Sequence, residues 1–185
     1  MIKTKTIILN IVLSLFYLVS AQAQKSEVVK IRKEYTRLKS TISGLKEAEY
    51  TGALYCLHTE DNVYGASYPA VGTYNRQRWF YYEIRGNGED PYEGTLVMVV
   101  EKTKRYGENK AYSEFMYQDG KLTFAYEKEF YDDNVEKRLY YYNGRFVQYT
   151  ENNIQKAYAD AEISIEKLLK KSEHLQQALK AIREE

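Results

Sequence analysis

The chain has 185 residues, a formal net charge of +1, 20 tyrosines, one cysteine and two histidines. A length of this order suits a single domain. The lone cysteine excludes an internal disulfide framework and any metal site built from several cysteines. The near-zero net charge argues against a nucleic-acid binder, which normally carries a clear basic excess.

Residues 1–23 have the pattern of a secretory signal peptide. Lys3 and Lys5 precede an apolar stretch from Ile7 to Val19, and the small-x-small sequence Ala21-Gln22-Ala23 follows it. The apolar stretch is shorter than the roughly 20 residues that a membrane-spanning helix needs. We therefore expect cleavage after Ala23 and a periplasmic or secreted protein. Residues 24–185 then form one α+β domain with no membrane span.

Two segments have helical periodicity. The first runs from Ser26 to Ser43, with one apolar stripe of Val28, Ile31, Tyr35, Leu38 and Ile42. The second runs from about Asn153 to Ile182, and Asn152 or Asn153 suits its N-cap. Its apolar positions are Ile154, Tyr158, Ala161, Ile165, Leu168, Leu175, Leu179 and Ile182, with Ser172 in the same seam.

Between the helices the apolar period changes to two, which predicts an antiparallel meander of about six to seven strands. Asp119-Gly120 and Asn143-Gly144 are typical of two-residue hairpin turns. Helix, strands and helix in this order indicate an α+β fold, with a curled half-barrel as a variant. The expected strands are Glu49–His58, Asn75–Arg85, Thr95–Lys104, Lys110–Gln118, Lys121–Phe130, Glu136–Tyr142 and Arg145–Glu151.

The two hairpins form a weak internal repeat at an offset of 24 residues. Tyr117 to Leu122 aligns with Tyr141 to Phe146, so both hairpins have the pattern Tyr-x-x-Gly-Lys/Arg-Leu/Phe. This pattern resembles one hairpin unit of MORN-type repeats. Repeat architectures need at least three units, and ordinary hairpin chemistry explains the match as well.

The signal peptide, the tyrosine-rich hairpins and the closing helix together resemble uncharacterised secreted α+β proteins of Gram-negative bacteria. The resemblance covers most of the chain after residue 23. It implies export and the fold class, and it implies no activity.

Register assigns residues to the two faces of the sheet. We expect Phe115, Tyr117, Leu122, Phe124 and Tyr126 on a core face, together with Phe80, Leu139, Tyr141 and Phe146. Because helices at both ends of the chain have stripes that suit this face, we expect both to pack on it. The other face would then carry Met116 and many aromatic side chains.

This second face has three explanations. The sheet curls and buries both faces, tyrosine serves only as a good strand former, or the face binds a ligand. Aromatic arrays suit sugar rings and peptides. On the third explanation, the ligand-binding residues are Trp79, Tyr81, Tyr140, Tyr142, Tyr149 and Arg138.

No catalytic motif is evident. Cys56 and His58 share a face of one expected strand, but residues at i and i+2 lie about 6.5–7 Å apart and no orienting partner is evident. We expect Cys56 to be a buried free thiol. The sequence therefore predicts no catalytic residue, no metal site and no cofactor.

The resulting hypothesis is an exported, non-catalytic binding or envelope-associated protein. Its partner would be an envelope glycan, a peptide or a protein. The alternative is a structural or interaction protein that uses the long C-terminal helix for partner binding or for a weak homodimer centred on Leu175.

Overall fold

The computed structural model describes residues 24–45, 54–69, 72–84, 94–104, 110–130 and 134–184. A helix over residues 24–44 precedes the strands, and a second helix, α2 (Tyr158–Arg183), closes the chain. The signal peptide predicted for residues 1–23 lies outside the described residues. The strands are β1 (Tyr55–Asp61), β2 (Ser67–Tyr68), β3 (Gly72–Thr73), β4 (Asn75–Ile84), β5 (Gly94–Lys104), β6 (Lys110–Gln118), β7 (Lys121–Glu129), β8 (Glu136–Tyr142), β9 (Arg145–Glu151) and β10 (Ile154–Lys156).

Eight strands form one open antiparallel sheet in the order β1-β4-β5-β6-β7-β8-β9-β10, and β2 and β3 form a separate short hairpin. The α+β class and the antiparallel meander are therefore confirmed. The sheet does not close into a barrel. The predicted turns are also confirmed, because Asp119, Gly120, Asn143 and Gly144 all have the positive φ angles of a type I′ turn.

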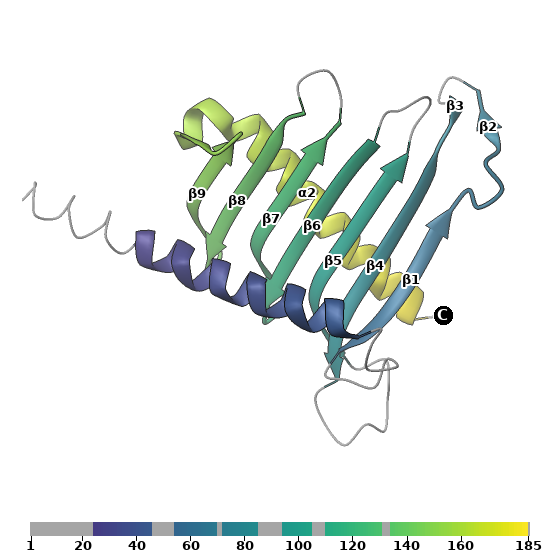
Figure 1. Ribbon diagram of the computed structural model, residues 1–185, viewed down its shortest axis with the longest axis horizontal. Helices are drawn as coiled ribbons and strands as arrows, with labels where there is room; N and C mark the ends of the chain where they lie inside the picture. The colour runs from purple at the N-terminus through teal and green to yellow at the C-terminus, as the bar shows by residue number, and fades with distance from the viewer. Residues whose placement is uncertain are drawn as a thin grey trace, which may run out of the picture.

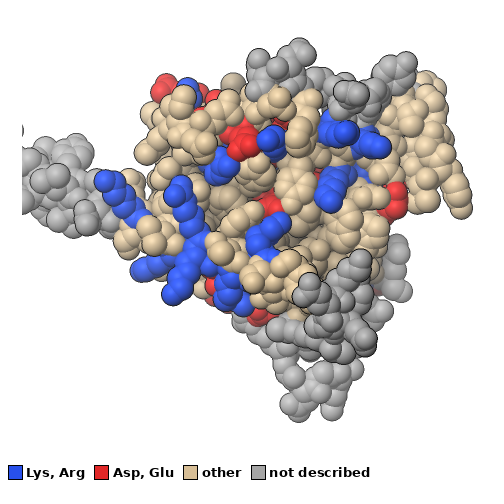
Figure 2. Space-filling view, in the orientation of Figure 1, with Lys and Arg blue, Asp and Glu red and all other residues tan. Residues whose placement is uncertain are grey.

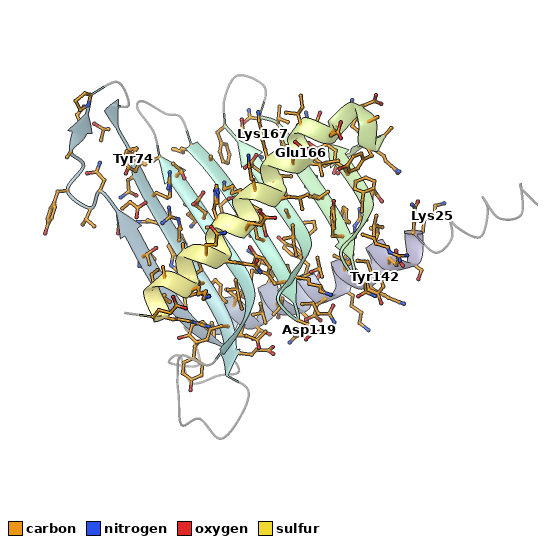
Figure 3. The ribbon with its side chains drawn as sticks, turned by 180° about the vertical axis from the view of Figure 1, so that it is seen from behind. Lys25, Tyr74, Asp119, Tyr142, Glu166 and Lys167 are labelled. Carbon is orange, nitrogen blue, oxygen red and sulfur yellow. The ribbon has the colours of Figure 1, made fainter. Side chains whose placement is uncertain are left out.

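The two helices lie on opposite faces of the sheet (Figures 1 and 3), so the fold has three layers. The helix α2 crosses one face diagonally and packs Ile165, Leu168 and Leu175 against Phe80, Phe115 and Leu139. The N-terminal helix crosses the other face and packs Val28, Ile31 and Leu38 against Met116, Phe124 and Tyr140. The prediction that both helices share one face is wrong.

The face assignment also fails inside each tight hairpin, for a local reason. The register shifts between Met116 and Tyr117, and again between Tyr140 and Tyr141, at equivalent positions of the internal repeat. Each shift is a β-bulge, and an extra residue reverses the alternation of side chains beyond it. Phe124 and Tyr126 therefore lie on the face of the N-terminal helix, and Tyr149 lies on the α2 face.

The C-terminal helix begins later than predicted. Asn152 and Asn153 have φ angles of 48° and 67° and turn the chain between β9 and β10, so neither is the N-cap. Ala157 occupies the N-cap position without a side-chain hydrogen bond. Ile154, which was expected in the helical seam, is exposed in β10.

Candidate functional site

The N-terminal helix leaves half of its sheet face uncovered. It crosses the strands near one end, and in Figure 1 the halves of β4 to β8 at the top of the view have no helix in front of them. Beneath the helix runs a row of paired residues that includes Met98, Met116, Phe124 and Tyr140, all of them buried. The next two rows form the floor of the region that the helix leaves open, although Val100 and Glu114 in this floor are buried by neighbouring side chains.

We call this uncovered region the sheet groove. The first row of its floor pairs residues directly across six strands. The second row lies two residues further along each strand, on the same face. The first row contains His58, Trp79, Val100, Glu114, Tyr126 and Arg138, and the second contains Glu60, Gln77, Lys102, Tyr112, Lys128 and Glu136.

One side of the N-terminal helix forms a wall of the groove. Arg32, Tyr35 and Lys39 recur at spacings of three and four, which places them on one side of the helix. The Tyr35 ring packs edge-on against Phe124 at 4.9 Å, and Arg32 donates to the Tyr140 hydroxyl at 3.2 Å. The apolar stripe that docks the helix therefore also orients these polar side chains toward the floor.

Glu114 is the buried charge at the centre of the groove, with 1% of its surface exposed. Tyr35 and Tyr112 both donate their hydroxyls to its carboxylate, and Lys39 Nζ lies 2.6 Å from its Oε1. Burial and the hydrogen bond to Glu114 raise the pKa of both the Tyr35 and the Tyr112 phenols. Both phenols thus remain neutral donors at physiological pH.

A second charged cluster lies at the β8 end. Lys128 and Arg138 hydrogen-bond the Glu136 carboxylate at 2.9 Å and 2.7 Å, and these bonds hold its pKa below the ordinary value. The Arg138 guanidinium also lies 5.1 Å from the centre of the Tyr126 ring. Both cations of this cluster are therefore paired with a carboxylate of the chain itself.

Two further cations, one on the floor and one on the helix wall, have no carboxylate partner in the described part of the chain. Lys102 Nζ lies 5.1 Å from the centre of the Trp79 ring, whose other neighbour is the His58 ring stacked at 4.8 Å. Arg32 lies 5.5 Å from the centre of the Tyr140 ring. Both side chains are exposed.

The groove contains two cavities that share Tyr112 in their lining. One, of about 550 Å³, lies between the N-terminal helix and the residues Glu114, Tyr126 and Arg138. The other, of about 470 Å³, lies around Gln77 and Lys102. Both are within the size range of small-ligand sites. Figure 2 shows that lysine and arginine outnumber aspartate and glutamate on this face.

The six predicted ligand-binding residues do not all lie on one face of the sheet, so that part of the prediction is wrong. Tyr140 is buried under the N-terminal helix, and Tyr149 is buried on the α2 face because of the β9 bulge. Tyr81 and Tyr142 are half-buried beside the helix. The structure places only Trp79 and Arg138 on the floor of the groove.

Sequence reasoning did not select Arg32, Lys39, Lys102 or Tyr112 as ligand-binding residues. The helical residues looked like a solvated face because nothing in their spacing reveals where the helix crosses the sheet. The prediction that the Cys56 thiol is buried is also wrong, because Cys56 is exposed. Cys56 lies in β1, an edge strand, where less packing covers it.

The opposite face has its own charged cluster under α2. Lys171 Nζ lies 3.0 Å from Glu101 and 3.3 Å from Glu127, and Arg78 lies 3.0 Å from Glu101. A cavity of about 400 Å³ adjoins it. These opposite charges satisfy one another, so the cluster serves to join α2 to the sheet.

In the described ranges, no three histidine, cysteine or acidic side chains gather closely enough to hold a metal ion. Neither helix in these ranges has the length and apolar character needed to cross a membrane. No protein family, curated protein or solved structure matches the chain.

Proposed function

We propose that this is an exported, non-catalytic binding protein whose sheet groove holds an extended glycan or peptide. The observation that carries the proposal is the floor of the groove, where aromatic rings and cations lie close together on β4 to β8. These side chains are Trp79, Lys102, Tyr112, Tyr126, Lys128 and Arg138. Rings supply a large apolar contact at low entropic cost, and their polar groups hydrogen-bond.

A rigid floor supports a binding role. Glu114, Tyr35 and Tyr112 are locked to one another, and the flanking Glu136 is held by two cations. Side chains fixed before a ligand arrives lose little freedom when it binds. Export rests on the signal-peptide pattern of residues 1–23.

The long helix α2 gains no support as an association surface. Its seam, including Leu175 and Leu179, is buried against the sheet. A homodimer centred on Leu175 would have to displace α2 from the core. We therefore place the ligand in the groove.

Titration of the purified protein with neutral oligosaccharides, acidic oligosaccharides and peptides tests the proposal. Trp79 is the only tryptophan and reports from the floor of the groove. We expect one class of probe to change its emission, and Tyr126→Ala to weaken binding of that probe about fivefold in calorimetry. Tyr64→Ala is the matched control, because Tyr64 is exposed in the turn after β1 and lines neither cavity of the groove.

Absence of binding for every probe, with the protein folded by circular dichroism, would overturn the proposal. Equal loss of affinity in Tyr126→Ala and Tyr64→Ala would remove the groove as the site. Mass spectrometry of protein expressed in a Gram-negative host tests export, and we expect Gln24 as the mature N-terminus.

A further inference from the structure

We propose that the ligand of the sheet groove is an acidic glycan, a chain of sugars that carries carboxylate groups. Arg32 and Lys102 would each contact one of these carboxylates. This inference rests on the proposed function and names its ligand class.

The first argument is the unequal pairing of the cations. Lys39, Lys128 and Arg138 are each within hydrogen-bond distance of a carboxylate of the chain itself. Among the described residues, Arg32 contacts an aromatic ring and a phenol, Lys102 contacts an aromatic ring, and neither pairs with a carboxylate. An exposed cation that no internal carboxylate neutralises is free to contact an anionic ligand.

The second argument is the separation of these two cations. Arg32 lies over Tyr140 of β8, and Lys102 belongs to β5, three strands away. Neighbouring strands are about 4.8 Å apart, and Lys102 lies four residues beyond the row of Tyr140. The backbone positions of Tyr140 and Lys102 are therefore separated by roughly 14 Å across the strands and by about 13 Å along them. One small anion cannot span this separation, whereas a chain with an acidic group at intervals can contact both.

The third argument favours a glycan over an acidic peptide. The strands β4 to β8 each pair with a neighbour on both sides, so no free strand edge lies in the part of the groove between the two cations. An extended peptide bound there would lose the backbone hydrogen bonds on which strand addition depends. Sugar rings need no such bonds and can stack on the Tyr112 and Tyr126 rings between the two cations.

The probe that tests this is an oligomer of galacturonic acid, compared with the same oligomer as its methyl ester. Esterification removes the charge and keeps the sugar rings. We expect calorimetry to show about tenfold weaker binding of the ester. Arg32→Gln and Lys102→Gln should each weaken binding of the acid by a larger factor than binding of the ester.

Two variants control for structural effects. Lys167→Gln removes an exposed cation from α2 on the opposite face and should change nothing (Figure 3). Arg32→Lys keeps the charge and should retain binding of the acid, which separates loss of charge from loss of helix packing.

Equal binding of the acid and the ester would overturn the inference and leave the proposed function standing. Binding of a glutamate oligopeptide in preference to both sugars would overturn it in favour of a peptide ligand. If neither these probes nor the neutral glycans and peptides bind, the proposed function fails as well.

Discussion

Lys39 on the N-terminal helix and Glu114 in the centre of the sheet form an ion pair, with 2.6 Å between Nζ and Oε1. The carboxylate is almost completely buried, and the lysine is partly exposed. The pair joins two layers of the fold at the groove, so it contributes both to helix docking and to the shape of the site.

Removal of the Glu114 carboxylate should loosen the N-terminal helix. Glu114→Ala leaves Lys39 and two tyrosine hydroxyls without their acceptor, at a cost of about 3 kcal/mol in the free energy of unfolding. Urea denaturation measures this cost. Glu166→Ala, at an exposed position of α2, is the control and should cost little. Equal stability of the two variants would contradict the role assigned to Glu114.

Acid should weaken the junction between α2 and the sheet. Burial alone would raise the pKa of the Glu101 carboxyl, but Lys171 and Arg78 outweigh burial and hold it below its ordinary value of 4.5. A carboxyl whose pKa is depressed in the folded state stabilises the protein above its unfolded pKa. That stabilisation is lost as the pH falls through the folded value.

We therefore expect Glu101→Gln to be less stable than the parent near neutral pH and to lose less stability between about pH 5 and pH 3. Denaturant titrations across this pH range measure how the free energy of unfolding changes with pH. Glu162→Gln, exposed on α2, should keep the pH dependence of the parent. If the free energy of unfolding changed with pH in the same way for Glu101→Gln and the parent, the role given to Glu101 would be contradicted.

Gly94 should not tolerate a side chain. A Cβ at this position would overlap the ring of Tyr82, which is buried, with Arg183 4.5 Å from its centre. We expect Gly94→Ala to destabilise the protein by about 1–3 kcal/mol, because the ring must move within a packed region. Gly44→Ala meets no atom within 4 Å and should be neutral or stabilising. Thermal melting compares the two variants, and a stable Gly94→Ala would contradict the packing at Tyr82.

Leu175 should act as a core residue rather than as a dimer contact. It is 4% exposed against the sheet, so Leu175→Ala should cost about 2–5 kcal/mol. Ile163→Ala, at a position 72% exposed on the same helix, should change stability by less than about 0.5 kcal/mol. Sedimentation equilibrium provides the second readout. A dimer dissociated by Leu175→Ala without loss of stability would restore the helix-mediated alternative.

Much of the fold could be predicted because its signals are local. The Asp119-Gly120 and Asn143-Gly144 turns require positive φ angles that few other residue pairs adopt readily. Short links between amphipathic strands then imply antiparallel neighbours. The ranges of β6, β8 and β9 accordingly match the expected strands residue for residue.

The candidate site could be predicted only in part, because it depends on relationships across layers. Trp79 and Arg138 were found through strand alternation. Tyr149 was assigned to the wrong face because alternation fails after a bulge, and the bulge at Val147 has no distinctive residue. Arg32 and Lys39 have ordinary solvated-face spacing, so only docking of their helix brings them to the groove.

The sequence by itself determined the order of the two helices and of seven strands between them, the hairpin turns, the α+β class and the two apolar helix stripes. The short strands β2, β3 and β10 were not predicted. Each of these follows from backbone preferences or periodicity within a few residues. Only the tertiary structure decided that the helices cover opposite faces and that one face remains half open between Arg32 and Lys102. An apolar stripe shows that a helix is buried against something, but the choice of face depends on packing among distant segments.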